Sequence, residues 1–152
     1  MPTAWRLVKE RYAATAFSGE GAAKVGGRWN SRGVRVVYVS GTRALAVLES
    51  LVHLNPSVPF QYVAIPVTFE TAWVERFPLE ELPPNWRESP PPPAAQQIGD
   101  AWVRAGRSVV LALPSVIVPE ETNYLLNPAH PDFPQLRLGP AEPFAFDPRL
   151  LA

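Results

Sequence analysis

The chain has 152 residues, of which 47% are hydrophobic and 18% charged, and its formal net charge at pH 7 is zero. This length and balance predict a folded domain with a hydrophobic core and exclude a disordered chain. The absence of cysteine excludes disulfides, thiolate nucleophiles and cysteine-bound metals. Because no apolar run is long enough to span a bilayer and the first residues do not resemble a signal peptide, we expect a cytoplasmic protein without membrane contact.

The first half of the chain is predicted to form two strands and a helix. Residues 4–8 and 34–40 read as strands, separated by a loop over residues 17–33 that is rich in Gly, Ser, Asn and Arg. Thr42 is suited to cap a helix over residues 43–54. The apolar stripe of this helix is expected to consist of Leu45, Leu48 and Val52, with Glu49 on its flank.

The second half is predicted to add a long helix and several strands. Residues 78–93, rich in proline, read as a stiff extended surface connection, and residues 94–105 as a helix that ends near Gly106. A short helix is expected at residues 123–128. Strands are expected at residues 60–67, 72–76, 108–113, 116–118, 135–138 and 144–146. Since strands and helices do not alternate regularly, we expect one α+β domain over residues 1–152, with a mixed, largely antiparallel, curved or split sheet and flanking helices.

The charges are distributed unevenly along the chain. Residues 1–50 contain eight of the fourteen Lys and Arg residues but three of the fourteen Asp and Glu residues, which gives this part a net charge of +5 and leaves −5 for the remainder. A basic segment attracts anionic ligands, although charges also cluster without any ligand. Because only two of the basic residues are lysine and no nucleic-acid-binding motif is present, we expect no direct contact with nucleic acid.

Several kinds of catalytic site are poorly supported. His53 and His130 lie far apart without a carboxylate pair at ligand spacing, so we expect no metal. Pro114-Ser115-Val116 is not a Gly-x-Ser-x-Gly nucleophile motif, and the sequence has neither a P-loop nor a Gly-x-Gly-x-x-Gly after a strand. Glu49 has no acidic companion in the same motif, which argues against a two-carboxylate glycosidase.

The most informative motif is Gly26-Gly27-Arg28-Trp29-Asn30. A glycine pair lets the backbone approach a ligand closely, and the Arg28 guanidinium carries a fork of donors that suits phosphate. A tight turn with a surface arginine is the alternative explanation. Cleavage of NAD⁺ between ribose and nicotinamide needs only one carboxylate, because nicotinamide leaves as a neutral molecule. The groups suited to hold the pyrophosphate, fix the nicotinamide and stabilise the cationic ribose are Arg28, Tyr38, Glu49 and Ser115.

The chain resembles the RES-domain toxins, a family named for its Arg, Glu and Ser residues. The resemblance runs from Trp5-Arg6 to Arg149-Leu150 and rests on the order and spacing of short motifs. Besides the glycine–arginine motif, these are Tyr38-Val39-Ser40, Ala46-Val47-Leu48-Glu49, Leu113-Pro114-Ser115, Asn123-Tyr124-Leu125-Leu126-Asn127-Pro128 and His130-Pro131. The resemblance implies an ADP-ribosyltransferase-like fold and the toxin of a type II toxin–antitoxin system. Such a toxin consumes NAD⁺, as its substrate and without a metal, by hydrolysis or phosphorolysis.

The same resemblance implies partners and residue roles. The expected partner is an Xre-type helix-turn-helix antitoxin, with a homodimer as a further option inside the complex. Glu49 would be the catalytic carboxylate, Arg28 would bind the phosphate or ribose of NAD⁺, and Tyr38 would line the nicotinamide end. The NAD⁺-binding set would be completed by Ser115, Arg6 and Asn123, although Arg6 equally suits a structural role and Asn123 a helix cap. Two alternatives stay open: a mono-ADP-ribosyltransferase that modifies a protein, and a non-catalytic module that binds an anionic partner.

Overall fold

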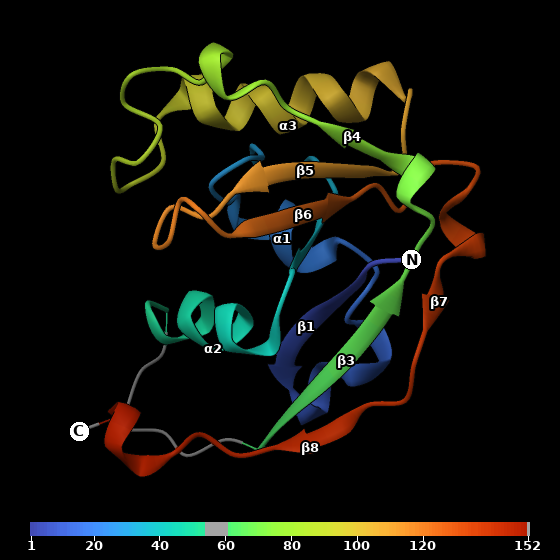
Figure 1. Cartoon of the computed structure of the whole chain (residues 1–152), viewed down its shortest axis with the longest axis vertical. Helices are drawn as coiled ribbons and strands as arrows, with labels where there is room; N and C mark the ends of the chain where they lie inside the picture. The colour runs from blue at the N-terminus through green and yellow to red at the C-terminus, as the bar shows by residue number, and fades with distance from the viewer. Residues whose placement is uncertain (54–60, 152) are drawn as a thin grey trace.

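The computed structural model describes residues 1–53 and 61–151, and a mixed sheet runs through its centre (Figure 1). Within these residues the sheet has eight strands in the order β4-β5-β6-β2-β1-β3-β7, with β8 beside β3. The strands are β1 (Thr3–Lys9), β2 (Val37–Ser40), β3 (Tyr62–Thr68), β4 (Val74–Arg76), β5 (Val110–Pro114), β6 (Thr122–Leu126), β7 (Arg137–Leu138) and β8 (Glu142–Phe144). The α-helices of the described residues are α1 (Glu20–Val25), α2 (Arg43–Leu51) and α3 (Pro93–Ala105), and short 3-10 turns lie at residues 10–15, 71–73, 79–81, 133–135 and 148–151.

The sheet divides into two parts where β1 meets β2. All seven residues of β1 pair with β3, whereas β1 and β2 share a single pair, Trp5 with Ser40. The remaining pairings are antiparallel except that of β4 with β5, which is parallel. The predicted α+β class with a largely antiparallel split sheet is therefore confirmed.

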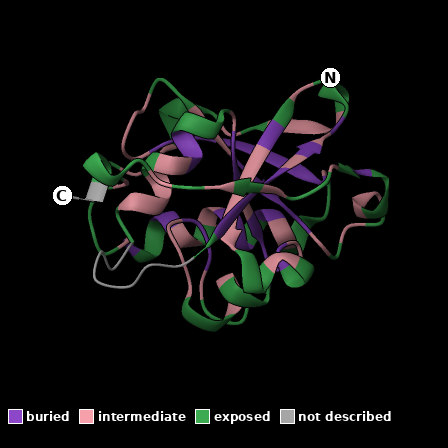
Figure 2. Cartoon of the chain, turned by 90° about the horizontal axis from the view of Figure 1, so that it is seen from below, coloured by how far each residue is buried: buried purple, intermediate pink, exposed green. Residues whose placement is uncertain are grey.

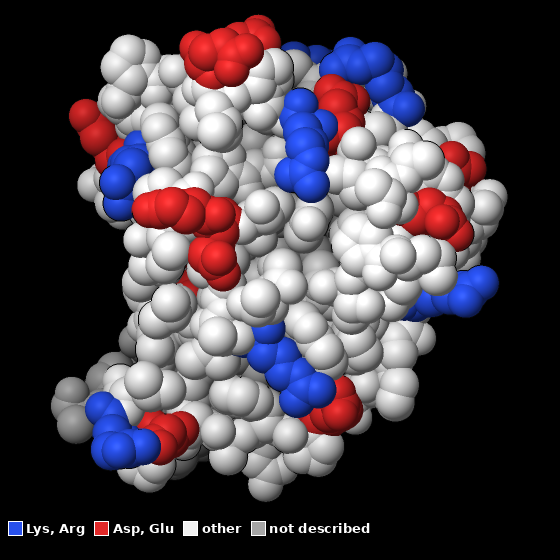
Figure 3. Space-filling model, viewed as in Figure 1, with Lys and Arg blue, Asp and Glu red and all other residues white. Residues whose placement is uncertain are grey.

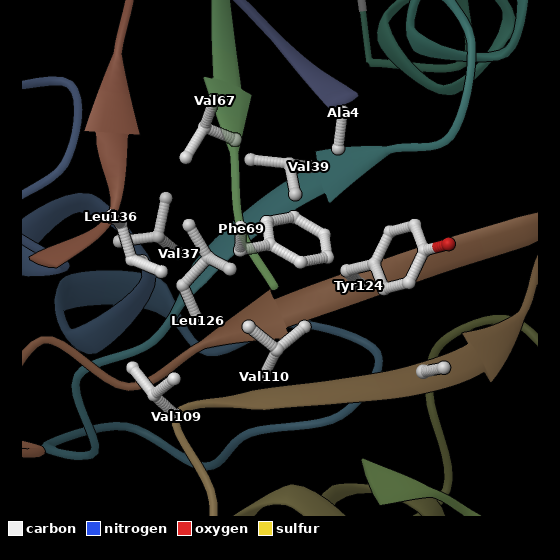
Figure 4. Close-up of a cluster of buried hydrophobic side chains, with 11 residues drawn as sticks. Ala4, Val37, Val39, Val67, Phe69, Val109, Val110, Tyr124, Leu126 and Leu136 are labelled. Carbon is white, nitrogen blue, oxygen red and sulfur yellow. The ribbon is translucent and has the colours of Figure 1, made fainter. Parts of the chain in front are cut away.

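Two hydrophobic clusters lie on opposite faces of β5 and β6. Because side chains alternate along a strand, Val110 and Leu126 belong to one cluster, and Leu111 and Leu125 to the other. The first cluster extends to Ala4 of β1 and Val67 of β3, and it includes Phe69, which follows β3 (Figure 4). Helix α3 covers the second cluster. Buried residues are concentrated in the strands, and exposed residues lie on the outer turns and loops and on the outer sides of the helices (Figure 2).

The two longer helices begin and end at the signals that the sequence carries. Thr42 caps α2, since its side-chain oxygen accepts from the backbone N–H of Leu45 at 3.0 Å. Helix α3 starts with Pro93 at its first position and ends at Gly106, whose φ of +63° is left-handed. Helix α2 ends at Leu51, earlier than predicted. The expected helix end at residue 54 and the expected strand start at residue 60 lie outside the described residues.

Some local predictions are wrong. Residues 122–126 form a strand where a helix was expected at 123–128, because β6 pairs on both sides, with β2 and β5. The expected loop at 17–33 contains α1, which is bounded by Gly19 and Gly26, both with positive φ. Residues 116–118 form bends instead of a strand. No helix in the described ranges is long and apolar enough to cross a membrane.

Candidate functional site

Glu49 lies on the inward side of α2 and not on the flank of an apolar stripe. The buried residues of this helix are Leu45 and Ala46, whereas Leu48 and Val52 are 38% and 61% exposed. The predicted stripe is therefore wrong in its last two members. Residues three and four positions apart share a helix face, so Glu49 follows Leu45 and Ala46 toward the sheet.

Two side chains hold the Glu49 carboxylate at one oxygen. Ser115 Oγ donates to Oε2 at 2.8 Å, and Asn123 Nδ2 donates to the same oxygen. Ser115 is fully buried, and its oxygen also accepts from the backbone N–H groups of Ile117 and Val118 at 3.1 Å each. These bonds direct its hydroxyl proton at Glu49. Since no described residue donates to Oε1, this is the oxygen that a ligand can engage.

The ends of three neighbouring strands bring these groups together. Ser115 follows the last residue of β5, and Asn123 lies near the start of β6, so antiparallel pairing puts both at one end of the sheet. Ser40, the last residue of β2, is the cross-strand partner of Asn123, and its Oγ donates to Asn123 Oδ1 at 2.7 Å. The chain then turns at Gly41 into α2. We call Ser40, Glu49, Ser115 and Asn123 the Glu49 cluster.

The pKa of Arg28 responds to burial and to the charge of Glu49. Burial lowers the pKa of Arg28, and the negative charge of Glu49 raises it in part. Arg28 Nη1 donates to the backbone carbonyls of Trp86, at 3.1 Å, and of Glu88. A guanidinium has five N–H donors, and no described residue accepts from Nε or Nη2 of Arg28. One edge of the fork therefore stays available to an anion, while the other edge is fixed.

The Tyr38 hydroxyl is committed to the loop that carries Arg28, which we call the Arg28 loop (residues 26–34). It accepts from the backbone N–H of Trp29 at 3.0 Å and donates to Asn30 Oδ1. Burial raises the pKa of Tyr38 far above its ordinary value, and the bond from Trp29 lowers it only in part. Tyr38 is thus a neutral phenol at neutral pH. Its expected place at the nicotinamide end stays a prediction.

The glycine pair has a structural reason within the fold. A Cβ at Gly27 would lie 2.6 Å from the Tyr38 hydroxyl oxygen and 2.9 Å from Asn30 Oδ1, so a larger residue would push the Arg28 loop off Tyr38. Gly26 ends α1 with a φ of +75°. The close approach that glycine permits is here an approach to Tyr38. A close approach to a ligand stays a prediction.

Helix α3 supports the Arg28 loop from the other side. Gln96 Nε2 donates to the carbonyl of Gly27 at 3.0 Å. The Asp100 carboxylate, which is buried, accepts from both the backbone N–H and the hydroxyl of Ser31. The loop is consequently fixed between a helix and a strand before any ligand binds.

Arg6 ties parts of the fold together. Its Nε donates to the carbonyl of Ala16 at 2.7 Å and its Nη1 to the carbonyl of Tyr38 at 3.2 Å. Burial lowers the pKa of Arg6 to about 10. These bonds fit the structural role that the sequence left open for Arg6, and its NAD⁺-binding role stays a prediction.

The proline-rich segment at 78–93 packs beside the site. The prediction of an extended surface connection did not include these contacts. Trp86 stacks on Trp29 of the Arg28 loop, with ring centroids 6.0 Å apart and planes 24° apart. Arg87 Nε donates to the carbonyl of Val116, just after Ser115. Together with the bonds from Arg28, these contacts connect the segment to the Arg28 loop and to the residue that follows Ser115.

Three buried polar residues, Asn30, Ser40 and Asp100, were not predicted as functional groups. Asn30 Nδ2 donates to the backbone carbonyls of three nearby residues. Ser40 donates to Asn123, and Asp100 accepts from Ser31. Asn30 and Ser40 belong to motifs that the resemblance used, which was their only signal. Asp100 had none, because its partner is 69 residues away in the chain.

The charges of the folded chain are mixed. Acidic and basic side chains are interspersed on the face shown in Figure 3, without a broad patch of one sign. Among the described residues no group of three or more His, Asp or Glu side chains is placed to hold a metal ion. What the site presents is one carboxylate oxygen, Oε1 of Glu49, and one guanidinium edge, that of Arg28, to which no described residue is hydrogen-bonded. Such a pair suits a ligand that carries both a cationic centre and a phosphate.

Comparison with known proteins agrees with these motifs. Residues 3–147 match the RES domain family. The chain is 38% identical over 149 residues to "Toxin Res" of Yersinia enterocolitica, covering 96% of this chain and 97% of that protein. It is 40% identical over 153 residues to "Prs ADP-ribosylating toxin" of Sphingobium sp., covering 97% and 95%.

A solved structure shares the fold. The structure of the MbcT–MbcA toxin–antitoxin complex of M. tuberculosis contains a chain that superposes with a TM-score of 0.72 at 17% sequence identity, covering 99% of this chain and 86% of that one. This chain therefore belongs to the RES-domain family, which has members named as toxins.

Proposed function

We propose that this chain is the toxin of a toxin–antitoxin pair and that it cleaves the bond between nicotinamide and ribose in NAD⁺. The observation that carries the proposal is the Glu49 carboxylate, held at Oε2 by Ser115 and Asn123 within the electrostatic reach of Arg28. The names of the relatives from Yersinia enterocolitica and Sphingobium support the toxin role.

The proposed chemistry needs one negative and one positive group. As the glycosidic bond breaks, positive charge develops on the ribose, and a fixed carboxylate stabilises it more strongly than mobile water does. Glu49 Oε1 supplies that charge. The free edge of Arg28 binds the pyrophosphate, where a guanidinium fork matches phosphate oxygens. Nicotinamide departs as a neutral molecule, so the step needs no proton donor, and the neutral Tyr38 need not act as one.

The acceptor of the ADP-ribose distinguishes two versions of this function. Water or phosphate would give a glycohydrolase or a phosphorylase. A protein acceptor would give a mono-ADP-ribosyltransferase, and the 40% identity to a relative named as an ADP-ribosylating toxin favours this second candidate. The proposed partner in either case is an antitoxin, of the Xre type, that closes the site. A non-catalytic anion-binding module is the remaining alternative.

The test is an assay of nicotinamide release. Purified chain is incubated with NAD⁺, with and without inorganic phosphate, and nicotinamide is separated by chromatography. Release that rises with phosphate indicates phosphorolysis, and release without phosphate indicates hydrolysis. A parallel incubation of a cell lysate with labelled NAD⁺, followed by mass spectrometry, detects a modified protein. If no nicotinamide is released and no protein is labelled, only the non-catalytic binding module remains.

A further inference from the structure

Asn123 has two ways to place its amide, and only one of them suits Glu49. A carboxamide has an oxygen that accepts and a nitrogen that donates. In the structure Nδ2 faces Glu49 Oε2, and Oδ1 accepts from Ser40 Oγ at 2.7 Å. The reversed amide would put two acceptor oxygens against each other. The hydrogen bond from Asn123 to the Glu49 carboxylate therefore requires the amide orientation that the structure shows.

Ser40 is the group that holds this amide at its oxygen. It is the cross-strand partner of Asn123 on the neighbouring strand, and its side chain lies in the interior with 5% of the residue exposed. Directly opposed residues of paired strands bring their side chains into contact. No other described residue donates to Asn123 Oδ1. The Glu49 carboxylate can only accept, so it requires Nδ2 to face it and leaves Oδ1 toward Ser40. A buried oxygen without a donor is unfavourable, and the hydroxyl of Ser40 supplies the donor that holds the amide in this orientation.

We propose that Ser40 is a positioning residue for the Glu49 carboxylate and that it acts through Asn123. The inference rests on the proposed function, in which Glu49 stabilises the cationic ribose. Ser115 and Asn123 fix Oε2 with two bonds, and loss of one of them lets the carboxylate turn and displaces Oε1. Asn123 then serves Glu49, which differs from the direct contact with NAD⁺ that the family resemblance implied.

The kinetic test is a double-mutant cycle with Ser40→Ala, Asn123→Ala and the double variant. Each single variant should lower kcat for nicotinamide release roughly tenfold, the change that corresponds to about one hydrogen bond, and should leave KM unchanged. The double variant should equal Asn123→Ala alone, because Ser40 acts only through Asn123. Ser50→Ala is the matched control: Ser50 lies next to Glu49 on α2, but its hydroxyl bonds the carbonyl of Ala46 at 2.8 Å. It should behave as wild type.

A second readout does not depend on activity. The side-chain amide signals of Asn123 in an NMR spectrum should shift in Ser40→Ala and stay in place in Ser50→Ala. Unchanged amide signals, additive losses in the double variant, or a raised KM with an unchanged kcat in Asn123→Ala would each overturn the role of Ser40. If the wild type neither releases nicotinamide nor modifies a protein, the proposed function fails, and the amide signals still decide whether Ser40 orients Asn123.

Discussion

Gly99 of α3 offers the sharpest test of how the Arg28 loop is held. A Cβ at this position would lie 1.8 Å from the backbone oxygen of Trp29, and contacts between real Cβ atoms and their neighbours essentially never fall under 3.0 Å. The neighbour is backbone and cannot rotate away. Gly99→Ala must therefore move the helix away from the loop.

The loss in the free energy of unfolding follows from the contacts that this movement disturbs. The forced separation strains one bond from Gln96 to Gly27 and two bonds from Ser31 to Asp100, which join the helix to the loop. Overpacking costs about 1–3 kcal/mol, and each weakened hydrogen bond adds about 1 kcal/mol. Alanine in a helix gains only about 1 kcal/mol over glycine. We expect the free energy of unfolding to fall by about 3–5 kcal/mol.

Urea denaturation followed by tryptophan fluorescence measures this change. The matched control is Gly21→Ala in α1, where a Cβ would meet nothing within 4 Å. That variant should keep or raise the free energy of unfolding, by up to about 1 kcal/mol. A Gly99→Ala protein as stable as Gly21→Ala would refute the close packing of α3 on the Arg28 loop.

Three further changes test the neighbouring parts of the site. Arg28→Ala should weaken NAD⁺ binding by about 1.5–3 kcal/mol in calorimetry, and Arg28→Lys should restore little of it, since a point charge lacks the fork; full rescue by lysine would contradict a geometric role. Tyr38→Phe should lower the free energy of unfolding by about 1–3 kcal/mol, because the hydroxyl bonds Trp29 and Asn30 in the interior; equal midpoints in urea would show that these bonds contribute nothing. Expression of the chain alone should arrest a bacterial host and deplete its NAD⁺, and co-expression of its antitoxin should prevent both; normal growth with unchanged NAD⁺ would contradict the toxin proposal.

Local signals predicted the elements whose stability is local. Thr42 and Gly106 marked the ends of two helices, and the observed caps match them. The expected helix at 123–128 failed for a different reason. Its residues have two partner strands, β5 and β2, of which β2 is distant in the sequence, and ladder hydrogen bonds on both sides outweigh the local preference. Helix α1 was missed because its glycines suggested a loop, although Gly19 and Gly26 mark its two ends.

The sequence motifs named residues that the structure places in contact, but they did not show how these residues are arranged. Glu49, Ser115 and Asn123 lie in direct contact, as the motifs suggested they would be near one another. The sequence did not indicate that Asn123 and Ser115 bind the same carboxylate oxygen, or that Ser40 donates to the amide oxygen of Asn123. Such bonds join residues up to 83 positions apart and leave no periodic pattern. They follow only once the strand pairing is known.

The central claim is that the Glu49 carboxylate is the group that makes this chain consume NAD⁺. The most direct measurement compares nicotinamide release by the purified wild type and by Glu49→Gln, with thermal unfolding to show that both are folded. Glutamine keeps the size of the side chain but removes the charge, and loss of one preorganised electrostatic group lowers kcat by about 10²–10³. We predict a loss of this size at an unchanged unfolding midpoint. Turnover by folded Glu49→Gln at a rate near that of the wild type would contradict the account.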